Sequence, residues 1–222
     1  MKRIRIQNLE WEFAGGLSYS SNNITALPED QSYNNFQSSA FRGFQLGAFP
    51  LFRISRPLAI RSGLMFLKRE YHFRQNVPWE ADYAEKSHML GIPVHAQYSF
   101  GYSDQRLNVY SGLQLNYLIR NSLTYSALAI PGYRQEGTIK NSFDRKRFLA
   151  EFQMGVGLRF QVSKVFIGVD VSYYLDLWDH SRFSPPRTLQ IYQDQEPPVA
   201  YYSPRYLGRG VMINLVFQKR RI

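Results

Sequence analysis

The sequence predicts an all-β fold, an eight-stranded antiparallel up-and-down transmembrane β-barrel, and it predicts that residues 1–222 form one domain. Three observations favour this fold. Apolar and polar residues alternate with a period of two through most of the chain, which places them on opposite faces of a strand. The connections between the alternating segments are short and long in turn. No stretch reaches the roughly 18 consecutive apolar residues of a transmembrane helix, which excludes a helical membrane protein.

The N-terminal half of the chain contains four of the predicted strands. Residues 11–19 alternate Trp, Phe, Leu and Tyr with Glu, Gly and Ser. Residues 41–52 and 58–73 alternate less regularly. Residues 90–100 place Leu, Ile, Val, Ala, Tyr and Phe on one face and Gly, His, Gln and Ser on the other. This half therefore has one apolar and one polar sheet face.

The C-terminal half contains the other four predicted strands, and its alternation is clearer. Residues 107–120 set Leu, Val, Tyr and Ile against Asn, Gly, Gln and Arg. Residues 148–162 and 165–176 repeat the pattern and are separated by Ser163-Lys164 alone, which predicts a tight hairpin. Residues 207–218 then form the strand that closes the barrel.

The lengths of the connections predict how the barrel sits in a membrane. Short connections occupy residues 53–57, 101–106 and 163–164, and long polar ones occupy residues 21–39, 74–86, 121–144 and 180–203. Outer-membrane barrels have short periplasmic turns and longer extracellular loops. The pattern therefore predicts the bacterial outer membrane, with both termini on the periplasmic side.

The polarity of the two faces distinguishes this barrel from a soluble one. The apolar face is nearly continuous, and the opposite face contains glycines, amides and full charges, so we expect the polar face to line the lumen. Eight strands leave room inside for side chains only. Charges buried there must neutralise one another, because an unpaired buried charge costs several kcal/mol. The predicted lumen network consists of Glu12, Arg61, His95, Arg120, Glu151, Arg159 and Asp170.

Aromatic residues near the strand ends are predicted to form girdles at the membrane surfaces. They are Tyr71, Phe73, Tyr98, Phe100, Tyr102, Tyr117, Tyr125, Tyr173, Tyr174, Trp178 and Tyr206. The formal net charge of +10 is then a solvated or headgroup-facing charge. No RRM, KH or zinc-finger pattern supports nucleic-acid binding. Cysteine is absent, which excludes disulfides and thiolate chemistry.

Two pairs of chemically active residues occur in the sequence. His180 and Ser181 are adjacent, and neighbouring residues on a strand point to opposite faces, so the histidine is not expected to activate the serine. His72 and His88 flank a predicted loop, but their spacing matches no regular metal site. We therefore predict no catalytic residues, no metal site and no cofactor.

The long loops are better candidates for a binding surface, because basic and aromatic side chains occur together in them. The candidate residues are Tyr133, Arg134, Lys140, Arg145, Lys146, Arg147, Tyr192, Tyr201 and Tyr202. Outer-membrane lipid, lipopolysaccharide in particular, and other envelope proteins are the expected partners, and loops that only solvate the barrel mouth are the alternative.

The chain resembles the PorT-like family of outer-membrane β-barrels. The resemblance rests on Leu90-Gly91-Ile92-Pro93-Val94, on residues 110–117 (YSGLQLNY) and on residues 155–158 (GVGL), and it covers nearly the whole chain. It implies an outer-membrane barrel, and some members of the family assist secretion or larger envelope assemblies.

These observations together predict a non-enzymatic outer-membrane protein that is a structural or partner-binding component of the bacterial envelope. Two alternatives come from other classes of protein. One is an outer-membrane enzyme that acts on lipid or peptide at the barrel rim, and the other is a soluble ligand-binding barrel.

Overall fold

The computed structural model describes residues 9–26, 36–39, 41–75, 80–101, 104–130, 133–140, 145–182, 188–191, 199–202 and 205–219. Its strands are β1 (Leu9–Ala26), β2 (Phe36–Ser39), β3 (Phe41–Arg53), β4 (Leu58–Ser62), β5 (Leu64–Gln75), β6 (Ala81–Phe100), β7 (Gln105–Ile130), β8 (Tyr133–Ile139), β9 (Phe148–Val162), β10 (Val165–Asp176), β11 (Thr188–Ile191), β12 (Val199–Tyr202) and β13 (Arg205–Lys219). Among the described residues no helix is long and apolar enough to cross a membrane.

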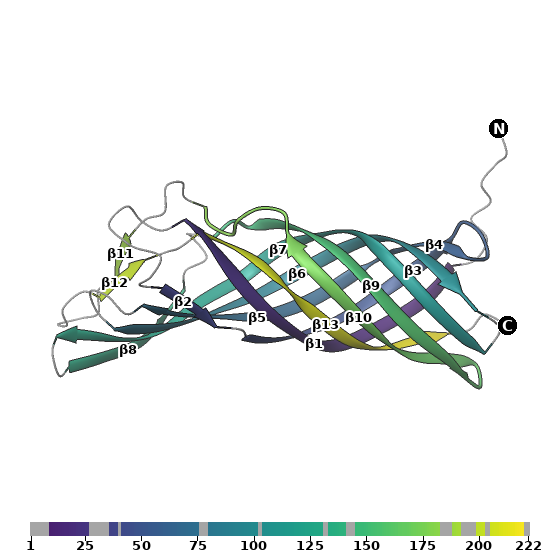
Figure 1. Ribbon diagram of the computed structural model, residues 1–222, viewed down its shortest axis with the longest axis horizontal. Coiled ribbons are helices and arrows are strands. Elements are labelled where there is room, and N and C mark those ends of the chain that lie inside the picture. The colour runs from purple at the N-terminus through teal and green to yellow at the C-terminus, as the bar shows by residue number, and fades with distance from the viewer. Residues whose placement is uncertain are drawn as a thin grey trace.

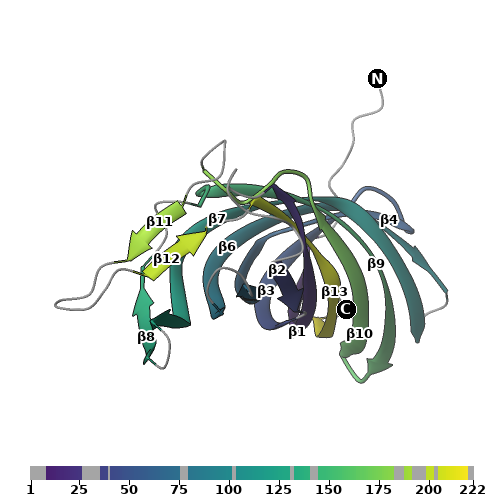
Figure 2. The same ribbon diagram turned by 60° about the vertical axis from the view of Figure 1, so that its left-hand side comes forward.

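Eight strands of the described chain close a ring, in which β4 and β5 count as one strand that Gly63 interrupts (Figure 1). The ring order is β1, β3, β4/β5, β6, β7, β9, β10 and β13, and every neighbouring pair is antiparallel. Phe13 of β1 pairs with Phe217 of β13, which closes the ring. Figure 2 shows the strands curving around a common axis. The predicted fold class is confirmed.

The strands run well past the predicted boundaries at the end of the ring that lies away from Leu9 and Lys219. β6 begins at Ala81 and β7 continues to Ile130, within segments expected to be loops. β8 pairs with the end of β7, and β2 pairs with the end of β5. We call this extension, formed by β2, β8 and the adjoining ends of β5, β6 and β7, the protruding sheet. β8 marks it in Figure 1, at the end of the molecule opposite to the start of β1.

One extra residue in β7 changes which side chains point into the ring. His88 pairs with Arg120 and Met89 pairs with Leu118, so Ile119 has no partner and forms a β-bulge. Before the bulge the buried residues of β7 are even-numbered, from Asn108 to Leu118, and after it they are odd-numbered, from Asn121 to Ala127. The bulge leaves Arg120 on the outer surface, so the prediction that it joins the lumen network is wrong.

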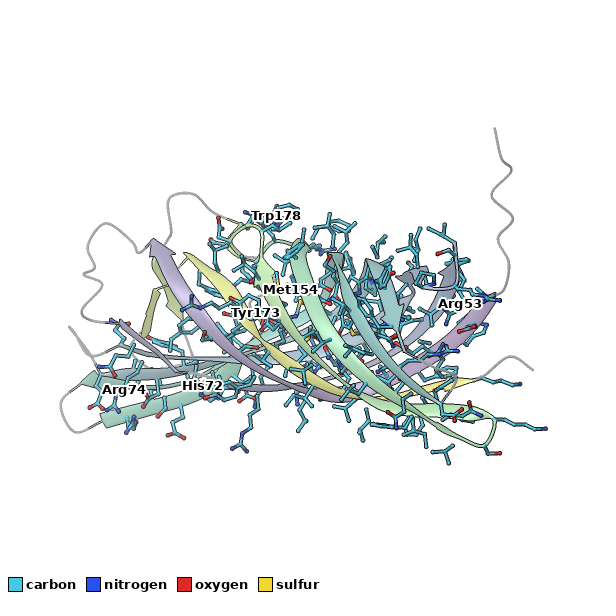
Figure 3. All side chains as sticks on the ribbon, turned by 45° about the vertical axis from the view of Figure 1, so that its right-hand side comes forward. Arg53, His72, Arg74, Met154, Tyr173 and Trp178 are labelled. Atoms are coloured by element: carbon cyan, nitrogen blue, oxygen red, sulfur yellow. The ribbon has the colours of Figure 1, made fainter. Side chains whose placement is uncertain are left out.

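The outer surface of the ring is apolar, as expected. Leu17 is 70% exposed and Leu115 is 58% exposed, while buried side chains such as Gln114 and Asn116 face the lumen. Met154 and Tyr173 lie on this outer surface in Figure 3. The alternation between faces therefore follows the sequence pattern through most of the ring.

Five aromatic residues that were expected in the girdles lie inside instead. Tyr71, Phe73, Tyr125, Tyr174 and Tyr206 are almost completely buried. Four of them pack in a cluster at the mouth of the ring, and Tyr174 lies deeper. The exposed members of the predicted set are Tyr98, Phe100, Tyr117, Tyr173 and Trp178, and Tyr102 lies outside the described residues.

Candidate functional sites in the lumen and on the protruding sheet

The first layer of charge in the lumen joins four residues from four different strands. Arg61 of β4 lies 2.7 Å from a carboxylate oxygen of Glu12 and 3.8 Å from one of Asp170. Arg159 of β9 contacts the same two acids at 3.1 and 2.5 Å. The two cations and two anions make a neutral group, which is the condition for burying charge at low cost.

The second layer is a bidentate pair between Arg69 of β5 and Glu151 of β9. Nη1 and Nη2 of Arg69 donate to the two carboxylate oxygens at 2.6 and 2.9 Å. Asn116 donates to the same carboxylate, and the Arg69 guanidinium lies 4.1 Å from the centre of the Tyr174 ring. Fork-to-fork geometry and the ring contact hold the guanidinium in one orientation.

The third layer lies at the mouth of the ring and is built around Glu85 of β6. Arg145 donates to both of its carboxylate oxygens, at 2.8 and 2.7 Å, and Asn121 donates to one at 2.7 Å. The Tyr206 hydroxyl donates to the same oxygen at 3.3 Å. Arg145 is therefore buried inside the barrel, and the prediction that it belongs to an exposed loop surface is wrong.

His180 and Ser181 fold inward beside this third layer. The His180 ring binds the carboxylate of Asp176 and stacks on Tyr206 with 4.7 Å between ring centres. The backbone N–H of Ser181 donates to Asp179, and Ser181 bridges to Arg145 through the backbone. His180 and Ser181 are 3% and 2% exposed, so their surroundings resemble those of packed core residues rather than of an open catalytic site.

His95 lies in the lumen, as the sequence predicted, but it forms no hydrogen bond there with a described residue. Its ring stacks on Tyr110 with 5.4 Å between centres. A cavity beside these two rings and Arg61 has a volume of about 10 Å³. That volume is enough for about one water molecule, so the lumen at this level is filled by side chains.

The predicted loop surface is only partly assembled. Arg134 is exposed and donates to Ser126 at 2.7 Å and to Asp82 at 3.3 Å. Lys146 pairs with Asp179. The remaining candidates are distributed as follows: Lys140 and Arg147 are exposed, Tyr133 lies in β8, Tyr201 and Tyr202 lie in β12, and Tyr192 lies outside the described residues.

The outer face of the protruding sheet is polar, and the sequence reading missed it. A hollow of about 550 Å³ lies there and is lined by Gln37, His72, Phe73, Arg74, Asp82, Tyr83, Ala84, Thr124, Tyr125, Ser126 and Glu136. Arg74 pairs with Glu80 and lies 3.9 Å from Asp82. Figure 3 shows Arg74 and His72 at this end of the molecule and Arg53 at the other. Continuing the even-odd pattern of residues 90–100 back to residue 81 would have placed Asp82 and Ala84 on the outer face.

The residues considered for a metal site do not converge. His72 contacts Glu70 and lies opposite Ala84, whereas His88 lies opposite Lys68, four residues away from His72 along β5. No group of three histidine, cysteine or carboxylate side chains suited to a metal ion occurs in the described part of the chain.

Comparison with known proteins agrees with this architecture. Residues 4–180 match the family described as outer membrane protein beta-barrel domain. The chain belongs to this family. Members of the outer membrane protein beta-barrel family lie in the outer membrane, so the apolar outer surface of the ring faces lipid. A soluble ligand-binding barrel is thereby excluded.

Solved outer-membrane barrels resemble the chain over almost its whole length. The outer membrane protein OprG from Pseudomonas aeruginosa is similar with a TM-score of 0.55 and 9% identity, over 97% of this chain and 98% of OprG. The outer membrane protease OmpT from Escherichia coli has a TM-score of 0.49 and 9% identity, over 99% and 98% of the two chains. Ail of Yersinia pestis has a TM-score of 0.35 and 12% identity, over 95% and 99%. No curated protein matches, and the likeness to OprG shows the fold alone.

Proposed function

We propose that this outer-membrane barrel is a non-enzymatic component of the envelope that binds a partner protein through the protruding sheet. The observation that carries the proposal is the reversal of polarity along the outer surface. Along the ring itself, outward side chains such as Leu113 and Leu115 are apolar. On the protruding sheet, outward side chains such as Asp82, Thr124 and Glu136 are polar and surround a hollow.

The filled lumen supports a binding role over a transport role. Three layers of ion pairs cross the inside of the ring, and the cavity beside His95 measures about 10 Å³. An eight-stranded ring leaves no aqueous channel when its side chains fill it. A solute would have to break the buried pair of Arg69 and Glu151 to pass.

We also propose the orientation of the barrel, with the termini at the periplasmic side of the outer membrane. β1 begins and β13 ends at one rim, where Glu12 pairs with Gln218, and the two-residue turn Ser163–Lys164 lies at that rim. Short turns and termini on the periplasmic side are the rule for these barrels. The protruding sheet then faces the outside of the cell. Within the family we place the chain near the PorT-like barrels, because of residues 90–94, 110–117 and 155–158.

A photoreactive amino acid placed at Thr124 tests the binding role in living cells. Thr124 lines the hollow, whereas Leu113 is a matched outward position in the membrane. We expect irradiation to give a discrete protein adduct from position 124 and none from position 113. The absence of an adduct at 124 overturns the binding role.

Efflux of a small dye from vesicles that contain the purified barrel tests the filled lumen. We expect the dye to be retained as in empty vesicles. Stepwise conductance or rapid efflux overturns the assignment of a closed barrel without transport activity.

A further inference from the structure

Basic residues occur where the apolar outer surface ends. On β3 the outward residues change from Phe44 to Arg42, and on β5 they change from Phe66 to Lys68. On β6 and β7 the same boundary is occupied by His88 and by the Arg120 that the bulge turns outward. We call Arg42, Lys68, His88 and Arg120 the basic belt.

Pairing between strands brings the members of the belt together. Lys68 pairs directly with His88, and His88 pairs directly with Arg120. Phe44, two residues from Arg42, pairs with Lys68. Four neighbouring strands therefore present one basic side chain each in adjacent positions. Arg209 of β13 and Arg147 before β9 are also exposed and extend the basic boundary to further strands.

The three permanent cations of the belt lack partners of opposite charge. Arg42, Lys68 and Arg120 form no ion pair with any residue that the structure describes. Other cations near this end do have such partners. Arg74 pairs with Glu80, Lys86 with Glu70 and Arg134 with Asp82. Glu70, two residues from Lys68 on β5, is held by His72 at 3.1 Å and by Lys86 at 3.8 Å and forms no ion pair with the belt.

Aromatic and aliphatic side chains lie directly below the belt. The Lys68 ammonium lies 5.9 Å from the centre of the Phe44 ring, and the rings of Phe44 and Phe66 pack with 5.8 Å between centres. Leu46 is 64% exposed farther down β3. A phosphate at the belt would thus have an apolar surface beneath it that can accept acyl chains.

We propose that the basic belt binds the phosphate groups of a lipid in the adjoining leaflet, with the acyl chains of that lipid lying on Phe44, Leu46 and Phe66. Because the proposed orientation places this leaflet outside, the lipid is the phosphorylated glycolipid lipid A. Each cation near an anionic membrane surface contributes about 1 kcal/mol, or roughly fivefold in affinity. Three unpaired cations within four neighbouring strands therefore favour a phosphate-bearing headgroup strongly over a zwitterionic one.

The test compares two triple variants with the same change in net charge. Arg42→Gln, Lys68→Gln and Arg120→Gln together remove the permanent charges of the belt. Arg74→Gln, Lys86→Gln and Arg134→Gln remove three cations that are already paired and lie on the protruding sheet. Both variants should fold, because all six side chains lie on the outer surface. A shift in gel migration on boiling checks that each variant has folded.

The affinity of each purified protein for diphosphoryl lipid A is measured in detergent micelles by native mass spectrometry, with dephosphorylated lipid A and inorganic phosphate as comparison ligands. We expect the belt variant to bind diphosphoryl lipid A at least tenfold more weakly than the unsubstituted barrel, and the control variant to bind it as the unsubstituted barrel does. Dephosphorylated lipid A should bind all three proteins equally. A smaller loss, an equal loss in both variants, or comparable binding of inorganic phosphate alone overturns the proposal.

The result of the lipid A measurement does not depend on whether the protruding sheet binds a partner protein. The lipid measurement uses the isolated barrel, whereas the crosslinking experiment changes position 124 alone and leaves Arg74 and Arg134 in place. Failure of lipid binding with a retained adduct at 124 refutes the belt alone. Surface labelling of the protruding sheet on intact cells tests the orientation separately, and labelling only after the outer membrane is broken refutes the assignment to lipid A.

Discussion

Replacement of Glu151 by glutamine keeps the size of the side chain but removes the negative charge that faces Arg69 in the lumen. The two hydrogen bonds between them measure 2.6 and 2.9 Å, and Arg69 is 1% exposed, so water cannot take the place of the carboxylate. Removing one partner of a buried pair destabilises a protein by about 3–5 kcal/mol. The Tyr174 ring, 4.1 Å from the guanidinium, offsets part of this loss. We expect Glu151→Gln to lower the free energy of unfolding by about 3 kcal/mol.

The assay is urea unfolding of the barrel in phospholipid vesicles, followed by tryptophan fluorescence and by the folded band on an unheated gel. Glu136→Gln is the control, because Glu136 is an exposed acid on the protruding sheet and its replacement should change stability by no more than about 0.5 kcal/mol. The double replacement of Arg69 by Met and Glu151 by Leu should recover most of the lost stability, since it removes both charges of this pair and leaves neither one buried without its partner. The reasoning fails if Glu151→Gln costs less than about 1 kcal/mol, or if the double variant is as unstable as the single one.

Two further pairs of substitutions test the packing of the ring and the position of the membrane. A Cβ at Gly168 would lie 1.9 Å from the Leu158 carbonyl oxygen, so Gly168→Ala should lower the free energy of unfolding by about 1–3 kcal/mol in the same urea titration. Gly15→Ala is the control and should have little effect, because the nearest atom to a Cβ at Gly15 is 3.3 Å away. Leu113→Arg places a charge in the lipid-facing band and should cost about 2–4 kcal/mol of unfolding free energy, while Thr124→Arg on the protruding sheet should cost almost nothing. Equal costs at positions 113 and 124 would refute the boundary between the apolar and polar outer surfaces.

The eight strands and their order could be predicted from the sequence because the two-residue period is local and needs no knowledge of distant contacts. The same two-residue period also predicts that Arg69 and Tyr71 face the lumen, because both are odd-numbered like Arg61 and the odd-numbered side chains of β4 and β5 point inward. Assigning Tyr71 to a girdle because it lies near a strand end ignored this parity. Tyr174 was misplaced for the same reason, since it shares a face with Asp170.

The bulge in β7 and the partner of Arg145 could not be predicted from the local alternation of apolar and polar residues. The bulge at Ile119 reverses the faces of β7, and no glycine or proline lies near it to indicate a bulge inside the strand. Arg120 and Tyr125 therefore lie on the face opposite to the one expected. The pairing of Arg145 with Glu85 joins positions 60 residues apart and depends on how the chain re-enters the mouth of the ring. Sequence reasoning could predict that buried charges would be neutralised, but it could not assign every partner.

The seam between β1 and β13 has a consequence for how the barrel is made. Glu12 of the first ring strand lies opposite Gln218 of the last, so the ring stays open until almost the whole chain is available. Until then both seam strands expose a row of unpaired backbone groups, which is a template for association with other chains. Contacts of such large sequence separation also form slowly. The unfinished protein must therefore be kept apart from its copies after synthesis, and a truncation that removes β13 should give an aggregating chain rather than a smaller barrel.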